Sequence, residues 1–434
     1  MILKRKKILI LWFLFLLVSF SYEKPIFIIS NMDRINPRLF DIATILALFI
    51  LPFTKPIRLQ NPIFFKYKYL LIWFGVCVIF SLSIYGFPFE INSYILFFYF
   101  KYLQELFVLW VASKILMEFI PLEWTFRIFI LSGLFVFLYS IYEFNYGMVG
   151  EIEFAPGKFV MKPPGVIWGP FGNTYFQIAN YLPFLFIITY GFATLYKGTK
   201  RILLYLCSGF IAWPLFFTGS RTGLALLLIS LAVFLLVRYR IYYSIWVVVF
   251  ISLLAITFFT IFNNQNIQTI DRLEGMENNE NNSIISRITL FEEFQIDSYA
   301  EDGILLPLFG GGFYVAPANG NFRIGYGFHN IYVFAFEQAG LIGFILFIAL
   351  LRKSYKILRE GLKYFKPNKR SLEYVFIATV FSYFIAEIIT GFAGHTFWRG
   401  FATNNFNTLR ILILIMASSL IFSKNNGSIQ IEKQ

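Results

Sequence analysis

The sequence predicts an all-α polytopic membrane protein with about 12 transmembrane helices and one long extracytoplasmic loop. Only 14% of its 434 residues are charged, whereas soluble domains average about 25%. Hydrophobic residues make up 58% of the chain, and long apolar runs recur along its whole length. The 57 Phe and 26 Tyr residues suit helices in lipid with aromatic belts at the interfaces. These observations exclude a conventional water-soluble domain.

The apolar runs define the individual spans, because a membrane-spanning helix needs about 20 mainly apolar residues. We expect twelve spans, at residues 8–22, 38–54, 69–86, 92–114, 124–145, 173–196, 201–217, 223–238, 241–262, 329–351, 373–392 and 407–423. The first span follows four basic residues, as in a signal peptide, but no small-residue cleavage site follows Phe20. We therefore expect this span to be retained.

The boundary between spans seven and eight needs a separate argument. The stretch from Ile202 to Val237 is almost continuously apolar. As one helix it would be roughly 54 Å long at about 1.5 Å per residue, too long for a ~30 Å hydrocarbon core. The chain must turn within this stretch, and residues 218–223 are the only polar place to do so.

Lysine and arginine predict the orientation of the spans. With a cytoplasmic N-terminus, every strongly basic loop falls inside, and residues 263–328, with nine acidic residues, fall outside. We expect spans one to nine in 1–262, an extracytoplasmic (periplasmic) loop with short helices in 263–328, and spans ten to twelve in 329–434 with a basic cytoplasmic loop at 352–372. Both termini are expected in the cytoplasm.

Composition and motifs narrow the possible chemistry. The net charge of +13 lies in short clusters between apolar runs, which favours a membrane protein over a nucleic-acid partner. The sequence has no P-loop, no dinucleotide-binding fingerprint, no HExxH and no cysteine cluster, and it holds only two histidines. We therefore expect no cofactor and no metal site.

The outer loop of about 65 residues is far longer than the ~12–15 residues above which a loop is commonly functional. It opens with the Asn-rich residues 278–282, and residues 283–294 follow with the spacing of a short amphipathic helix. Gly310, Gly311 and Gly312 lack the strand and helix that flank a nucleotide-binding loop. They are weak evidence for any particular ligand.

Three arginines on the outer side are candidate anion ligands. Arg221 stands in the polar turn that opens span eight, where a helix N-terminus and a guanidinium could bind a diphosphate together. An interfacial arginine that reaches to the headgroups fits the same sequence equally well. For Arg287, a surface charge balancing Glu292 and Glu293 is the simpler interpretation, and Arg323 has the same alternative.

His329 begins span ten and could accept a hydroxyl proton at neutral pH. A residue that satisfies backbone groups at a helix start fits as well. Glu337, two turns deeper, is an intramembrane acid and so a functional candidate, although we favour a structural role. Lys101 and Glu105 are spaced to pair within the bundle, and we also prefer a structural role for them. For His395 and Arg399 the sequence indicates no role.

Several motifs follow one another in a distinctive order. They are T-G-S-R-T-G at 218–223, Ser286-Arg287, G-G-G at 310–312, and H-N-I-Y followed by E-Q-A-G-L-I-G over 329–343. Shorter pieces at 164–165, 171–173 and 180–182 precede them. Over residues 160–350 they resemble the bacterial O-antigen ligase/polymerase superfamily, which contains Wzy-type polysaccharide polymerases and O-antigen ligases.

This resemblance implies a GT-C-like, metal-independent glycosyltransferase of the bacterial cytoplasmic (inner) membrane, with its active site facing the periplasm. The donor would be a glycan on undecaprenyl diphosphate. Arg221 and Arg287 would neutralise the diphosphate, and His329 would deprotonate the acceptor hydroxyl, with inversion. The implied diphosphate or substrate contacts are Ser220, Thr222, Arg323, Asn330 and Lys162. The implied structural supports are Glu337, Gly310 and Gly312.

The motifs leave the exact reaction open. We prefer a polymerase that extends O-antigen, capsule or exopolysaccharide, with a lipid-linked acceptor and a chain-length regulator as a further partner. A ligase that transfers the glycan to a lipid A core is the alternative. A lipid-linked sugar flippase, a secondary transporter or a structural scaffold would be different classes. Transporters often have repeat-related halves, whereas this chain gathers its candidate residues on one face.

Overall fold

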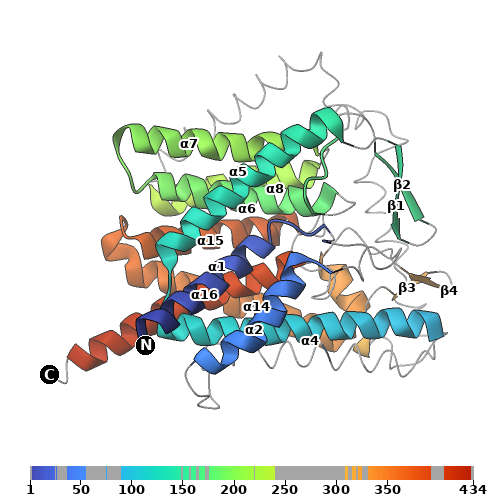
Figure 1. Ribbon diagram of the computed structural model, residues 1–434, viewed down its shortest axis with the longest axis horizontal. Helices are drawn as coiled ribbons and strands as arrows, with labels where there is room; N and C mark the ends of the chain where they lie inside the picture. The colour runs from blue at the N-terminus through green and yellow to red at the C-terminus, as the bar shows by residue number, and fades with distance from the viewer. Residues whose placement is uncertain are drawn as a thin grey trace.

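The structure is a computed structural model that describes residues 2–24, 26, 37–54, 75, 89–147, 150–155, 158–162, 166–171, 175–218, 220–239, 308–310, 315–318, 321–324, 331–391 and 405–431. These residues form a bundle of α-helices with two short β-hairpins (Figure 1). The helices are α1 (Ile2–Ser19), α2 (Leu39–Ile50), α4 (Phe89–Glu118), α5 (Leu122–Tyr146), α6 (Tyr175–Ala193), α7 (Gly198–Ala212), α8 (Arg221–Arg238), α14 (Ile331–Phe365), α15 (Leu372–Thr390) and α16 (Asn405–Ile431).

Short 3₁₀ helices extend or connect three of these helices. They are η2 (Leu51–Phe53) after α2, η3 (Trp213–Phe217) after α7, and η5 (Lys366–Asn368) between α14 and α15. Each has a proline in its first turn, where the missing N–H costs nothing because the first helical N–H groups have no partner within the helix.

The described helices agree with a multi-pass membrane protein. Four of them are long and apolar enough to cross a membrane by length and composition: Leu122–Tyr146, Gly198–Phe217, Arg221–Arg238 and Leu372–Thr390. Shorter apolar helices lie at Leu39–Phe53, Gln177–Ala193 and Thr408–Ser423. The expected spans at 69–86 and 241–262 fall outside the described residues, apart from Gly75. The total of twelve spans therefore stays a prediction.

The turn predicted within the long apolar stretch is present. Helix α7 ends at Ala212, η3 continues to Phe217, and α8 begins at Arg221. A second boundary differs from expectation, because α14 continues to Phe365. Most of the basic stretch expected as a loop at 352–372 is thus helical, as its Leu, Lys, Arg and Glu residues favour.

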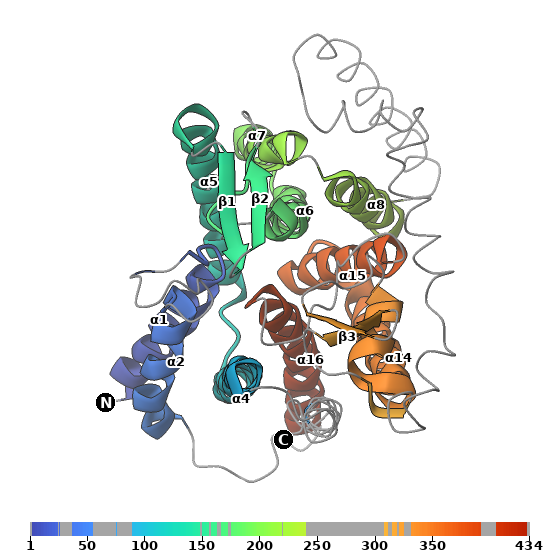
Figure 2. The same ribbon diagram turned by 90° about the vertical axis from the view of Figure 1, so that its right-hand side faces the viewer.

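Two antiparallel hairpins add strands that we did not predict. Strand β1 (Gly150–Ala155) pairs with β2 (Lys158–Lys162), and β3 (Val315–Ala318) pairs with β4 (Asn321–Ile324). Figure 2 views the bundle from the end where both hairpins lie, with β1 and β2 in front of α5 and α6. The second hairpin belongs to the segment for which we expected short helices. The amphipathic helix expected at 283–294 lies outside the described residues.

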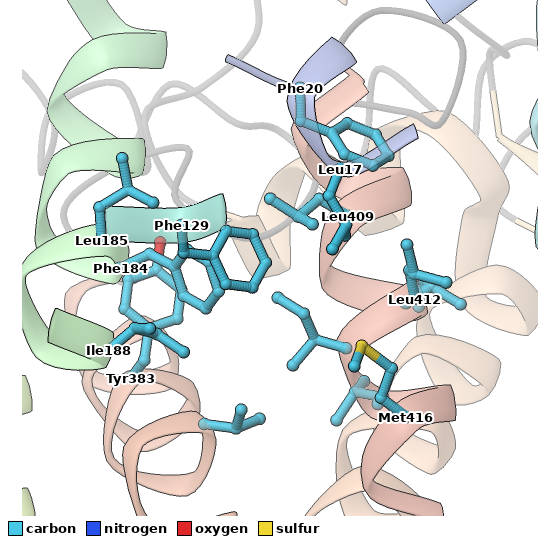
Figure 3. Packing of buried hydrophobic residues seen from close by; sticks show 14 of the residues in the cluster. Leu17, Phe20, Phe129, Phe184, Leu185, Ile188, Tyr383, Leu409, Leu412 and Met416 are labelled. Carbon is cyan, nitrogen blue, oxygen red and sulfur yellow. The ribbon is translucent and has the colours of Figure 1, made fainter. Parts of the chain in front are cut away.

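Aromatic packing holds the middle of the bundle together. Phe129 of α5 meets Phe184 of α6 edge to face, with ring centroids 5.2 Å apart. Phe184 in turn packs on Tyr383 of α15 at 5.3 Å. Figure 3 shows these rings close to aliphatic side chains of α1 and α16. Such edge-to-face pairs are each worth about 0.5–1.5 kcal/mol beyond the area they bury.

Several of the described basic clusters lie at the end of the bundle opposite the hairpins. The start of α1 and the end of α16 lie there (Figure 1). The turn from α6 to α7, with Lys197, Lys200 and Arg201, and the basic second half of α14 share this end. These described clusters, which the sequence analysis assigned to one side of a membrane, therefore lie at one end of the bundle.

Candidate functional site

The polar turn before α8 is built by its own hydroxyl groups. Ser220 is the N-cap of α8, and its Oγ accepts a hydrogen bond of 3.1 Å from the N–H of Gly223. The Oγ1 of Thr218 accepts a bond of 3.2 Å from the N–H of Ser220. These bonds fix the first turn of α8, from which Arg221 and Thr222 extend, both half-buried. The positive end of the helix dipole and a guanidinium therefore coincide, which favours an anion.

Gly223 sets the position of this turn against α6. A Cβ at Gly223 would lie 2.7 Å from the carbonyl oxygen of Ala179 and 2.9 Å from its Cβ. Only a residue without a side chain lets the two helices approach this closely. The start of α8 is therefore held beside the start of α6.

The start of α14 lies at the same end of the bundle as the start of α8. Tyr374, near the start of α15, donates to the carbonyl of Val237, near the end of α8, over 3.0 Å. These two helices therefore run antiparallel, so that the end of α15 lies beside Arg221. There the N–H of Ile331 donates to the carbonyl of Gly391 over 3.0 Å, and Tyr332 donates to the carbonyl of Ile388 over 2.9 Å.

The segment Leu308–Gly310 contacts α14 at Gly340. This residue interrupts α14 with φ +61° and ψ −166°, a conformation that favours glycine. A Cβ at this position would lie 2.5 Å from the backbone nitrogen of Phe309. The short segment Leu308–Gly310 therefore packs directly against the break in the helix. Gly310, the residue after this contact, has φ +77°, and its role as a structural support stays a prediction.

Lys162 lies in a buried cluster with Glu143. The Nζ of Lys162 donates to Oε1 of Glu143 over 2.5 Å and lies 5.3 Å from the ring centre of Trp168. Oε2 of Glu143 accepts the N–H groups of Trp168, at 3.2 Å, and Gly169, at 2.6 Å. The side chains of Lys162 and Glu143 are only 5% and 7% exposed. The ammonium group of Lys162 therefore pairs with a carboxylate of the protein itself.

Several predicted site residues lie outside the described part of the chain. They are Arg287, Gly312, His329 and Asn330. His395 and Arg399, to which the sequence analysis assigned no role, also lie outside it. The backbones of Arg323, in β4, and Glu337, in α14, are described, but their side chains lie outside the description. The structure therefore places Ser220, Arg221 and Thr222 together and brings the residue after Asn330 to the same end of the bundle.

The structure also shows polar residues that the sequence analysis missed. Glu143 is one, and the ion pair between Glu387 of α15 and Arg410 of α16 is another. All three stand in predicted spans, so the rule that intramembrane charges are rarely accidental could have flagged them. Lys101, which the sequence analysis did consider, pairs with Asp41 of α2, and Gln104 donates to the same carboxylate.

Among the described residues, no group of three or more His, Cys, Asp and Glu side chains is placed to hold a metal ion. What the described arrangement offers instead is a cationic helix start at the end of a membrane bundle. Such a site binds phosphate oxygens through N–H groups and a guanidinium.

Comparison with known proteins gives one family match. Residues 206–348 match the family model described as O-antigen ligase. The match begins within α7 and includes the Arg221 turn, α8, Leu308–Gly310 and the first half of α14. No curated protein matches the chain. All of the expected site residues except Lys162 fall inside the matched range.

Proposed function

From the premise that residues 206–348 carry the O-antigen ligase family domain, we propose that this protein transfers a glycan from undecaprenyl diphosphate at the extracytoplasmic face of a bacterial inner membrane. The family supports a glycosyl-transfer enzyme acting on lipid-linked glycans in the membrane. The GT-C-like architecture with twelve spans, both termini in the cytoplasm and the active site on the periplasmic side, belongs to this proposal.

One observation carries the proposal. The capped start of α8, with Arg221, lies at the same end of α15 as the start of α14. His329 is two residues before that start in the sequence. Arg221, which would bind the diphosphate, and His329, which would accept the proton, come from distant parts of the chain. They would thus meet at one end of the bundle, as glycosyl transfer requires.

In the proposed reaction, an acceptor hydroxyl attacks the anomeric carbon of the lipid-linked sugar. The new glycosidic C–O bond forms as the bond to the diphosphate oxygen breaks, with inversion. His329 takes the hydroxyl proton. Arg221 and Arg287 stabilise the negative charge that develops on the departing undecaprenyl diphosphate. Ser220, Thr222, Arg323 and Asn330 would complete the substrate contacts, with Glu337 and the glycines 310 and 312 as supports.

We prefer a polymerase that joins repeat units into O-antigen, capsule or exopolysaccharide. The ligase is the second candidate, because the matching family model is described as O-antigen ligase. Both use the same donor chemistry. A deletion strain distinguishes them: surface glycan of single repeats indicates a lost polymerase, whereas full-length polymer left on the carrier lipid indicates a lost ligase.

Mutation tests the proposed site itself. Arg221→Ala and His329→Ala should each abolish glycan transfer while the protein still inserts into the membrane at the normal level. Removal of one preorganised charge-stabilising donor typically costs about 10²–10³ in rate. Normal polymer ladders from either variant would remove that residue from the site.

A further inference from the structure

Glu143 connects three separate segments at the hairpin end of the bundle. It lies in the last turn of α5, and its carboxylate receives Lys162 from the end of β2 and two successive N–H groups from residues 168 and 169. Successive N–H groups that converge on one anion form a nest, a common anion-binding arrangement of the backbone. Here the anion is part of the protein.

The backbone around residue 169 is shaped for this contact. Gly169 has φ +71°, and a Cβ there would lie 2.5 Å from the Cδ1 of Ile178 in α6. Any other residue would be strained in conformation, and the side chain of Ile178 would have to shift to make room for its Cβ. The neighbouring carbonyl of Pro170 accepts the N–H of Glu23 over 2.8 Å. The segment 166–171 is therefore fixed from several sides, with the Glu143 carboxylate at its centre.

This segment leads directly to the turn that carries Arg221. The N–H of Ile167 donates to the carbonyl of Phe217 over 3.0 Å. Phe217 ends η3, three residues before Ser220. Phe144, the neighbour of Glu143, also packs on the ring of Phe217, with centroids 5.1 Å apart. Phe217 is thus linked to the end of α5 directly by the aromatic contact of Phe144, and indirectly by the backbone bond from Ile167, whose segment Glu143 holds.

We propose that Glu143 is a positioning residue for the Arg221 turn and that Lys162 serves this carboxylate rather than the donor diphosphate. The inference rests on the proposed function, because the turn is taken to bind the diphosphate. A carboxylate that accepts three hydrogen bonds, one of them from an ammonium, holds its partners with strong, charge-assisted bonds. Loss of its charge would loosen residues 166–171 and displace the guanidinium of Arg221.

The test compares Glu143→Gln and Lys162→Met in the purified full-length protein. The same helix offers a matched control, since Glu123 pairs with Arg127 at 2.6 Å near its other end and both side chains are about half exposed. Glu123→Gln and Arg127→Met remove the same charges far from the turn. If Glu143→Gln is not recovered folded, Glu143→Asp replaces it. This variant keeps the charge but shortens the reach of the carboxylate, so it weakens the hydrogen bonds from Lys162, Trp168 and Gly169 and should raise exchange in 166–171 in the same direction; unchanged exchange would again overturn the inference.

The first measurement is amide hydrogen exchange, which does not depend on any activity. Glu143→Gln should raise exchange in the peptide covering 166–171 by roughly ten-fold or more, because local opening becomes easier. Lys162→Met should raise it less, because the N–H bonds from Trp168 and Gly169 remain. The two control variants should leave it unchanged. Unchanged exchange in Glu143→Gln would overturn the inference.

The second measurement is kcat/KM for the lipid-linked donor in a double-mutant cycle with Arg221→Lys. Glu143→Gln should lower kcat/KM by on the order of 10- to 100-fold, as small misplacements of a binding group can. Its effect should shrink in the Arg221→Lys background, because both changes act on one contact. Effects that multiply fully would assign Glu143 to general stability and overturn the inference.

The two proposals fail in different ways. A wild-type protein that transfers no glycan contradicts the proposed function, whatever the exchange data show. A wild-type protein that is active, loses activity with Arg221→Ala and keeps it with Glu143→Gln contradicts only the positioning role.

Discussion

Glu387 of α15 and Arg410 of α16 form an ion pair inside the bundle, with side chains 1% and 6% exposed. The pair lies one turn before Gly391, the residue that holds the start of α14 through Ile331. A charge buried in this way is costly unless its partner is present. The pair therefore links the packing of α15 on α16 to the end of the bundle where the candidate site lies.

Removal of one member of this pair should destabilise the protein strongly. Glu387→Gln leaves the guanidinium of Arg410 without a carboxylate, which typically costs about 3–5 kcal/mol. The expected result is a clear fall in Tm of the detergent-purified protein. The double variant Glu387→Gln/Arg410→Met should recover much of the loss. An exposed control, Glu123→Gln, should change stability by less than about 0.5 kcal/mol. Equal effects at the two sites would contradict the prediction.

Substitutions at Ser220 can distinguish its role in capping α8 from the effect of charge at the site. Asn and Asp cap helices about as well as Ser, so Ser220→Asn and Ser220→Asp should both keep a Tm close to that of the wild type. Ser220→Asp adds a negative charge beside Arg221 and should abolish transfer from the diphosphate donor, whereas Ser220→Asn should retain a measurable rate. Full activity of Ser220→Asp would argue against an anion site at this helix start.

Gly340 should tolerate no side chain. Gly340→Ala forces a Cβ to within 2.5 Å of the nitrogen of Phe309 at a positive φ, and strain of this kind costs on the order of 1–3 kcal/mol before any backbone shift. We expect a lower Tm together with reduced activity. Gly209→Ala is the control, because nothing lies within 4 Å of its Cβ position in α7. That change should be neutral or stabilising by up to ~1 kcal/mol.

The proposed orientation can be tested by labelling. In a background with Cys77→Ser and Cys207→Ser, Tyr146→Cys places a thiol at an exposed position at the hairpin end, and Lys366→Cys places one in η5 at the opposite end. A membrane-impermeant maleimide should label Tyr146→Cys in spheroplasts and Lys366→Cys only after permeabilisation. Labelling of both thiols from the same side would contradict the orientation.

The sequence also contained signals that went unused. Pro156-Gly157 and Asn319-Gly320 are turn dipeptides between short stretches that can form strands. The strands on either side of them pair as β1 with β2 and as β3 with β4. Helical expectations for a membrane protein masked these local patterns. The kink at Gly340, by contrast, could not be predicted, because a lone glycine is common within membrane helices.

By itself, the sequence determined the membrane class, the turn before α8 and the sorting of basic clusters to one side, because hydropathy, span length and loop charge are local properties. It also carried the motifs that the family match contains. The tertiary structure alone decided that α8 and α14 start at the same end of α15, and that Glu143 and Glu387 face Lys162 and Arg410. These contacts join residues far apart in the chain, and only the packing of whole helices determines which buried charges meet.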